Sequence, residues 1–121
     1  MADVDGDGRL ELLIAHGESG AQPLSFYRPQ ANANNWLRVL PLTRQGAPAR
    51  GALVRLLTST RTQIQAIDAG SGYLCQMEPV AHFGLGSETG VKEIQIQWPD
   101  GKQLQVAHPP VNQLLRIPYP R

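Results

Sequence analysis

Apolar and polar residues alternate along several short segments in the second two thirds of the chain. The clearest case is the segment 92–106, in which Ile94, Ile96 and Trp98 are separated by single polar residues. Side chains two positions apart share one face of a strand, so the segment predicts a hairpin with one dry face and one wet face. Its turn at residues 99–102 contains a proline with preset φ and a glycine that accepts positive φ, which favours a defined register.

Short segments of this kind recur, and none keeps the 3.6-residue apolar period of an amphipathic helix. Glycine, proline and polar residues separate them, which is typical of strands joined by turns. Strands are predicted at residues 36–42, 52–58, 62–67, both halves of 92–106, and 113–117. Two sheets packed face to face would bury the apolar faces, so we predict an all-β fold, an antiparallel β-sandwich, with a partly open β-barrel as the alternative.

The N-terminal segment has a different pattern. Residues 3–11 place four carboxylates at short intervals, and Gly6 and Gly8 permit a turn that would bring them together. Ca²⁺ takes roughly six to eight oxygen ligands in proteins. We therefore predict a calcium site in which one residue, the arginine, contributes its backbone carbonyl; the five ligand residues are Asp3, Asp5, Asp7, Arg9 and Glu11.

This acidic loop is not an EF-hand. An EF-hand needs a glutamate at the twelfth loop position, where Ile14 stands, and a helix on each side. The loop leads instead into a short apolar run at residues 10–14, which is more typical of a strand because glycines soon follow it. A solvated acidic turn without a metal is the alternative interpretation.

The pattern also divides the chain into parts. One loop with a strand or two cannot bury its own apolar face, and such hairpins usually belong to arrays whose neighbours cover them. We predict that residues 1–28 are a remnant of the last blade of a β-propeller that precedes them in the intact protein. Residues 29–34 would form a linker, and residues 35–118 the β domain.

The composition and charge of the chain limit the classes of protein and partner that fit it. The 121 residues are 41% hydrophobic and 17% charged, which fits one soluble domain with a short additional segment. No apolar run approaches the roughly 20 residues of a membrane span, and no targeting signal is visible. Five acidic side chains lie within residues 1–18, whereas the remainder is mildly basic and rich in arginine, which favours anionic partners such as acidic proteins or sulfated glycans. Nucleic acid is not expected, since no reader motif is present.

Four signatures carry a family resemblance. They are NWLRV at 35–39, GAxV at 51–54, the pair GSGYL at 70–74 and HFGLG at 82–86, and WPDG at 98–101. In this order they resemble the ASPIC/UnbV domain over nearly all of residues 35–117, and residues 3–11 resemble the calcium loop of FG-GAP repeats. The resemblance implies a secreted, extracellular, calcium-binding glycoprotein family. Its members act through contacts with extracellular proteins or matrix components, and not by catalysis.

The sequence contains few residues whose type and spacing would suit catalysis. His16, His82 and His108 are scattered singly, and none has the spacing of a metal ligand or of a nucleophile and its base. Glu78 and Asp68 could form an acid and base pair on an all-β frame. A carbohydrate-active or hydrolytic enzyme is therefore the alternative function.

Three further residues bear on contacts. Cys75 is the single cysteine, so it forms no internal disulfide; a buried apolar role and a bond to a cysteine elsewhere both remain open. Tyr73 and Trp98 are the kind of side chain that anchors a partner. Because Trp98 shares the dry face of its hairpin with two isoleucines, we predict that it packs in the core.

Overall fold

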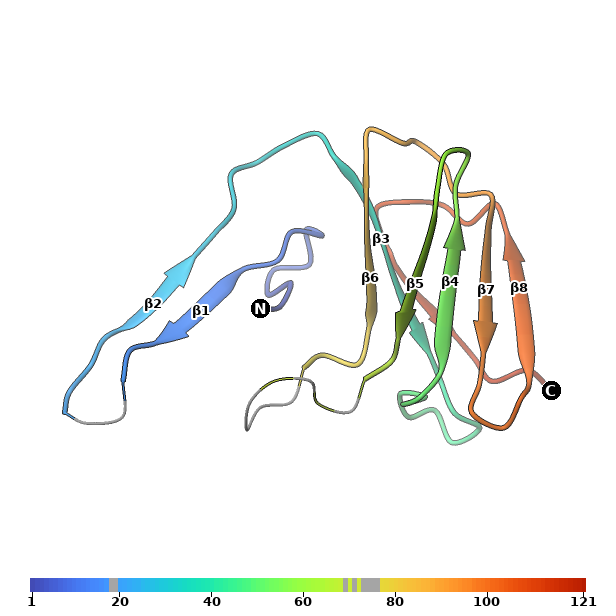
Figure 1. Ribbon diagram of the computed structural model, residues 1–121, viewed down its shortest axis with the longest axis horizontal. Coiled ribbons are helices and arrows are strands. Elements are labelled where there is room, and N and C mark those ends of the chain that lie inside the picture. Colours follow the sequence, from blue (N-terminus) through green and yellow to red (C-terminus); the bar gives the residue numbers. More distant parts are fainter. Residues whose placement is uncertain (18–19, 69, 71, 73–76) are drawn as a thin grey trace. The chain divides into compact units, whose positions relative to one another are not determined.

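The computed structural model describes the chain at residues 1–17, 20–68, 70, 72 and 77–121. These residues form two compact units, Met1–Asn32 and Ala33–Arg121. All the strands of both units are drawn in Figure 1, and the described residues include no helix long and apolar enough to cross a membrane. Of the residues singled out by the sequence, Tyr73 and Cys75 lie outside the described part of the chain, as does most of the signature at 70–74.

The first unit contains the acidic loop and one two-stranded sheet. Strands β1 (Leu12–Ala15) and β2 (Leu24–Tyr27) pair antiparallel, with Leu12 opposite Tyr27. Most large apolar side chains of this hairpin are exposed, among them Leu24 at 67% and Phe26 at 47%. The described residues of this unit include no second layer that would cover these side chains, and an isolated two-stranded hairpin is marginally stable in water.

The second unit contains seven strands among its described residues, arranged in two sheets. One sheet has the order β6-β3-β9, formed by β6 (Ala81–Gly86), β3 (Asn35–Pro41) and β9 (Leu114–Ile117). The other has the order β5-β4-β7-β8, formed by β5 (Thr62–Ala66), β4 (Leu53–Leu57), β7 (Glu93–Gln97) and β8 (Gln103–Ala107).

Both sheets turn an apolar face toward one core. Alternate residues of β4 and β7, such as Leu56 and Ile94, have no exposed surface, and Phe83 of β6 meets them from the other sheet with none either. The sheets do not close into a barrel. The β-sandwich prediction is therefore confirmed, and Trp98, only 3% exposed, packs in the core as expected.

The β7-β8 hairpin has the predicted register. Ile94 pairs with Val106 and Ile96 with Leu104, so the dry faces of the two strands coincide. At the turn, the Trp98 amide donates to the Lys102 carbonyl over 2.8 Å, and Gly101 takes a φ of 87°. Only glycine adopts that φ without strain, which explains the residue at this position.

Two features of the smaller sheet differ from the sequence expectation. The alternation pattern does not predict β6, because glycines at positions 84 and 86 take the places of side chains on its outer face. Strand β9 runs parallel to β3, so this sheet is mixed and not purely antiparallel. The connection from β8 to β9 crosses between the sheets through two residues with positive φ, His108 and Asn112.

Glutamine side chains join the two sheets along one side of the sandwich. The Gln65 amide of β5 donates to the His82 carbonyl over 2.6 Å and accepts from the His82 amide over 2.9 Å. Gln63 donates to the Gly84 carbonyl over 3.1 Å. The two side chains thus supply hydrogen bonds that a neighbouring strand would otherwise give to β6.

We expect Gln65→Ala to lower the free energy of unfolding by about 1 to 3 kcal/mol, because it leaves two part-buried backbone groups of His82 without their partner. Gln103→Ala, on the exposed face of β8, is the matched control and should change it by less than about 0.5 kcal/mol. Urea unfolding of the two variants measures both values. If the two variants lower the free energy of unfolding equally, the hydrogen bonds between Gln65 and His82 do not hold the sheets together.

A second polar cluster lies at the opposite end of β5. The Glu88 carboxylate accepts the Thr60 hydroxyl and lies 3.6 Å from Nε of Arg61. The hydroxyls of Thr58 and Thr60 beside it hold the pKa of Glu88 below its ordinary value of 4.5. A carboxylate with a lowered pKa stabilises the folded state above its unfolded pKa, and this contribution is lost as the pH falls through the folded pKa.

Accordingly, Glu88→Gln should cost most stability at neutral pH, where the carboxylate is charged in both the folded and unfolded chain. The difference between wild type and variant should shrink as the pH falls below 4.5. Urea midpoints measured at a series of pH values test this. A difference that stays constant down to acid pH would contradict it.

Candidate functional site

The acidic loop is closed by backbone pairing at its two ends. The Ala2 amide donates to the Glu11 carbonyl over 3.2 Å, and the Glu11 amide donates to the Ala2 carbonyl over 2.9 Å. Between these ends the chain turns at Gly6 and Gly8, whose φ values are 78° and 82°. The sequence folds this way because glycine alone takes these values without a steric penalty.

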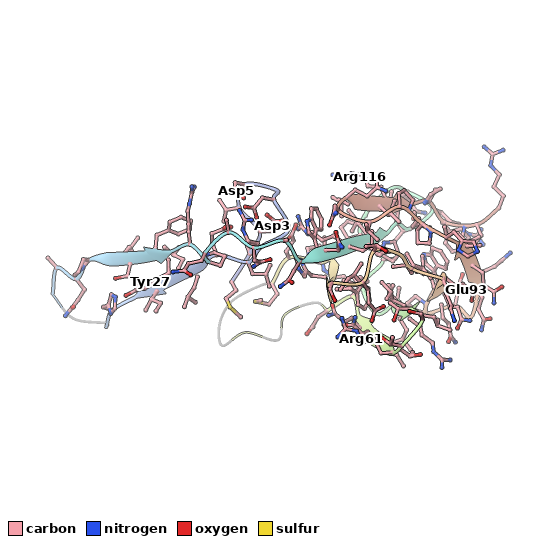
Figure 2. All side chains as sticks on the ribbon, turned by 90° about the horizontal axis from the view of Figure 1, so that it is seen from above. Asp3, Asp5, Tyr27, Arg61, Glu93 and Arg116 are labelled. Atoms are coloured by element: carbon pink, nitrogen blue, oxygen red, sulfur yellow. The ribbon has the colours of Figure 1, made fainter. Side chains whose placement is uncertain are left out.

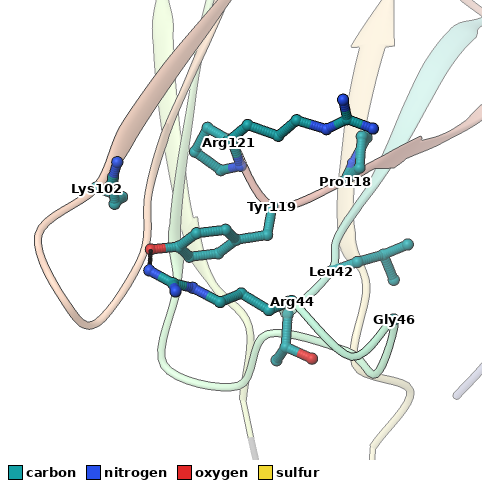
Figure 3. Close-up of a pocket in the computed structure, with 9 residues that line it drawn as sticks. Leu42, Arg44, Gly46, Lys102, Pro118, Tyr119 and Arg121 are labelled. Atoms are coloured by element: carbon teal, nitrogen blue, oxygen red, sulfur yellow. Dashed lines mark hydrogen bonds between the residues drawn. The ribbon is translucent and has the colours of Figure 1, made fainter.

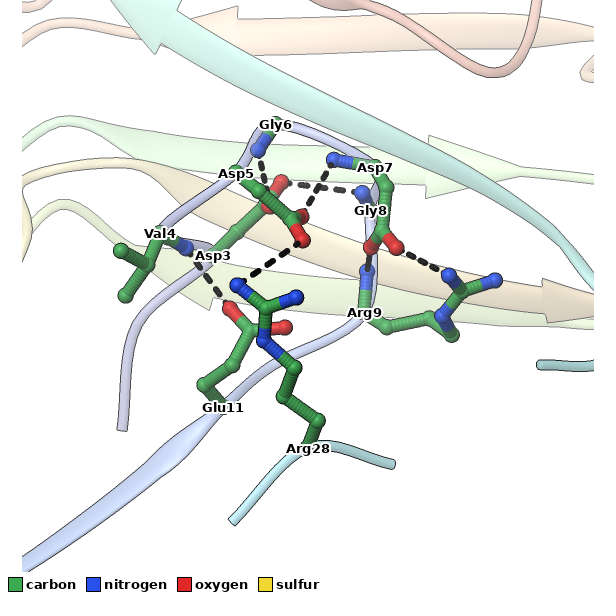
Figure 4. A network of polar contacts seen from close by, with 9 residues as sticks. All are labelled: Asp3, Val4, Asp5, Gly6, Asp7, Gly8, Arg9, Glu11 and Arg28. Atoms are coloured by element: carbon green, nitrogen blue, oxygen red, sulfur yellow. Dashed lines mark hydrogen bonds and ion pairs between the residues drawn. The ribbon is translucent and has the colours of Figure 1, made fainter. Parts of the chain in front are cut away.

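Backbone amides fix the carboxylates of this loop (Figure 4). Asp3 accepts from the Gly6 amide over 2.8 Å through Oδ1 and from the Gly8 amide over 3.0 Å through Oδ2. Oε2 of Glu11 accepts from the Val4 amide over 2.8 Å. These amides therefore hold two nearly buried carboxylates in place.

Three carboxylates converge within the loop. Oxygens of Asp3, Asp5 and Glu11 all lie within 4.8 Å of one another. Asp3 and Asp5 are two positions apart in the loop and lie near each other (Figure 2), whereas Glu11 comes from the segment that leads into β1. Like charges at this separation repel, and the attraction of a bound cation to each carboxylate would offset that repulsion. All the candidate ligand atoms are carboxylate oxygens, which suit a hard cation such as Ca²⁺ or Mg²⁺.

Asp7 and Arg9 lie outside this group of three. The Asp7 carboxylate accepts from the Arg9 amide over 2.8 Å and forms an ion pair with the Arg9 guanidinium. Of the five residues predicted as ligands, the structure therefore brings three side chains together and pairs the other two with each other. The spacing of the carboxylates does not predict that the Arg9 side chain is the counterion of one of them.

A second cation near the loop was also missed. A guanidinium nitrogen of Arg28, which follows β2, lies 4.0 Å from Oδ2 of Asp5. Both side chains are well exposed, at 65% and 39%. Nothing in the sequence signals this contact, because it depends on the β1-β2 hairpin folding Arg28 back beside the loop.

The residues considered for catalysis are engaged in other contacts. Glu78 forms an ion pair with Arg38, and the His82 ring stacks on Trp36 with 6.3 Å between ring centroids. Nε2 of His16 lies 2.7 Å from Oγ of Ser25 on the exposed hairpin. A catalytic serine and histidine also need a group that orients the imidazole, and the described residues supply none for this pair.

The fold and the loop together define a β-sandwich module preceded by an acidic loop with oxygen donors. The sequence profile of the family described as ASPIC and UnbV matches residues 42–121, and the chain belongs to this family. The resemblance noted from the sequence signatures is confirmed. The match begins after the first signature, at residues 35–39.

Sequence comparison extends the similarity over the whole chain. It is 54% identical over 125 aligned residues to Cartilage acidic protein 1 of Homo sapiens, an alignment that covers 100% of this chain. It is 52% identical over 124 residues to the protein of the same name from Xenopus tropicalis, with 99% of this chain covered. Each alignment covers 19% of the relative, so the chain spans about a fifth of the length of these proteins.

Proposed function

We propose that this chain is part of an extracellular, non-catalytic binding protein whose acidic loop holds Ca²⁺ and whose β-sandwich makes contacts with proteins or matrix components. The convergence of the Asp3, Asp5 and Glu11 oxygens within 4.8 Å is the observation that carries the calcium site. The relatives named Cartilage acidic protein 1 support a place in extracellular matrix.

The loop residues have distinct parts in this proposal. Asp3 and Glu11, already fixed by backbone amides, would be the rigid ligands, and exposed Asp5 would complete the carboxylate set. Asp7 and the Arg9 carbonyl remain proposed ligands, and Asp7 would have to leave its ion pair with the Arg9 side chain. The ion would neutralise the clustered charge and rigidify the entry to β1.

The first unit also has a proposed neighbour. Leu13, Leu24, Phe26 and Tyr27 of the hairpin are between 47% and 67% exposed, which is costly for side chains of this size. We propose that residues 1–28 belong to the last blade of an FG-GAP type propeller, and that adjacent blades cover these side chains. The 19% coverage of the relatives leaves ample chain for such an array.

Calorimetric titration of Ca²⁺ into the 121-residue chain tests the site. We expect saturable binding that Asp5→Asn abolishes, because that change removes one of three converging carboxylates while the backbone bonds of Asp3 and Glu11 remain. Glu93→Gln, which removes a negative charge from β7 in the other unit, is the control and should leave the affinity unchanged. Binding that survives Asp5→Asn would contradict this assignment.

Removing Arg28 should have the opposite effect. Its guanidinium near Asp5 competes with a bound cation, so Arg28→Gln should raise the calcium affinity by about two-fold. Arg55→Gln makes the same charge change at an exposed position of β4 in the second unit and should have no effect. The same calorimetric titration compares the two variants, and an affinity lowered by Arg28→Gln would rule out competition.

A further inference from the structure

A cleft of about 420 Å³ lies at one end of the β-sandwich, around the ring of Tyr119. We call it the Tyr119 cleft. It is formed by three segments that are far apart in the sequence: the loop after β3, the β7-β8 turn and the chain after β9. The residues used below are Leu42, Arg44, Lys102, Pro118, Tyr119 and Arg121 (Figure 3).

The charge of this cleft has one sign. Arg44, Lys102 and Arg121 line it, and no acidic side chain is among its described lining residues. In the described part of the chain, Lys102 and Arg121 have no ion-pair partner. Three cations that share a concave surface attract anions more strongly than the same charges spread over a flat one.

Arg44 is held in position by the aromatic residues beneath it. Its guanidinium carbon lies 4.7 Å from the centroid of the Tyr119 ring, and one of its nitrogens donates to the Tyr119 hydroxyl over 3.2 Å. Tyr119 in turn packs edge-on against Trp98, with 5.7 Å between ring centroids. Trp98 is buried in the core. The guanidinium is therefore ordered before any ligand arrives, which reduces the entropy lost on binding.

One carboxylate lies close to this assembly without lining the cleft. Asp100 accepts the Tyr119 hydroxyl, and this hydrogen bond, followed by one from the Lys102 amide, holds the pKa of Asp100 below its ordinary value. The Tyr119 hydroxyl also raises the pKa of Arg44. The Asp100 carboxylate is thus hydrogen-bonded to Tyr119, and the side chains of Lys102 and Arg121 stay available to a ligand.

We propose that the Tyr119 cleft binds a sulfate group of a sulfated glycan chain. A sulfate ester has three free oxygens and stays ionised at all physiological pH values, so that one group can accept hydrogen bonds from more than one cationic side chain. A side-chain carboxylate offers only two oxygens. Leu42, Pro118 and the Tyr119 ring add apolar surface for the carbon face of a sugar.

The size of the cleft agrees with such a ligand. Its volume of about 420 Å³ lies at the small end of ligand sites, which suits one or two sugar rings of a longer chain. This inference rests on the proposed function in matrix contacts and names the ligand class. It does not depend on the calcium loop, which belongs to the other unit.

The test is an NMR titration of the isotope-labelled 121-residue chain with a heparin-derived hexasaccharide at low ionic strength. A chelator is present throughout, so a failure of the calcium site does not affect the result. The desulfated hexasaccharide and a short glutamate peptide are titrated in parallel. We expect amide shifts at the Tyr119 cleft with the sulfated sugar alone, and loss of binding when salt is added.

Two double variants with equal charge change locate the binding. Lys102→Gln with Arg121→Gln should weaken it by about five-fold, since each removes one exposed charge contact. The control combines Arg55→Gln with Arg116→Gln, at exposed positions of β4 and β9 that do not line the cleft, and should weaken it by less than about two-fold. Arg116 is labelled in Figure 2.

Equal weakening by the two double variants would overturn the proposal, because it would mean that the net charge of the chain attracts the glycan and the cleft does not. Binding of the desulfated sugar as tightly as the sulfated one would also overturn it. So would tighter binding of the glutamate peptide, which would make the ligand an acidic peptide.

Discussion

The indole of Trp98 connects the two sheets at the end of the sandwich where the cations gather. Its Nε1 donates to the Leu42 carbonyl over 2.9 Å, which joins the end of β7 to the end of β3. Leaving such a buried donor unpaired would cost about 1 to 3 kcal/mol. Tyr119 packs on this indole and Arg44 packs on Tyr119, so the position of an exposed charge depends on a hydrogen bond inside the core.

The two units hold their polar groups in place by different means. In the second unit, side chains are positioned by a core that strands of both sheets share. In the first unit, the Asp3 and Glu11 carboxylates are positioned by the amides of their own loop, because a two-stranded sheet offers them no core to pack against. The core of the second unit is stable by itself. The loop of the first unit concentrates negative charge, so any cation that neutralises this charge stabilises it.

The sequence predicts best what depends on short-range pattern. Strict alternation over residues 92–106 determines the β7-β8 hairpin, its dry face and its register, since these follow from the two-residue period of a strand. The same pattern fails at β6, where Gly84 and Gly86 remove the side chains that would mark its outer face. The parallel pairing of β9 with β3 is decided by a crossover between sheets, which no local pattern contains.

The sites show the same division between local and long-range information. The convergence of Asp3, Asp5 and Glu11 could be predicted because nine consecutive residues contain the loop and its glycines. That Asp7 pairs with the Arg9 side chain could not, since carboxylates that are equivalent in sequence become distinct only when the backbone is folded. The Tyr119 cleft could not be predicted, because Arg44 and Arg121 are far apart in the sequence and line the same cleft only in the folded chain.

The glutamine bridge between β5 and β6 has a consequence for how the protein behaves at high concentration. An outer strand normally presents free amides and carbonyls that a second molecule can extend into a longer sheet. On β6, Gln65 occupies both backbone groups of His82, and Gln63 occupies the carbonyl of Gly84. These groups of β6 are therefore not free to pair with a strand of another copy. Two neutral glutamines supply most of this protection, and the Arg61 guanidinium also donates to the Gly84 carbonyl over 3.1 Å.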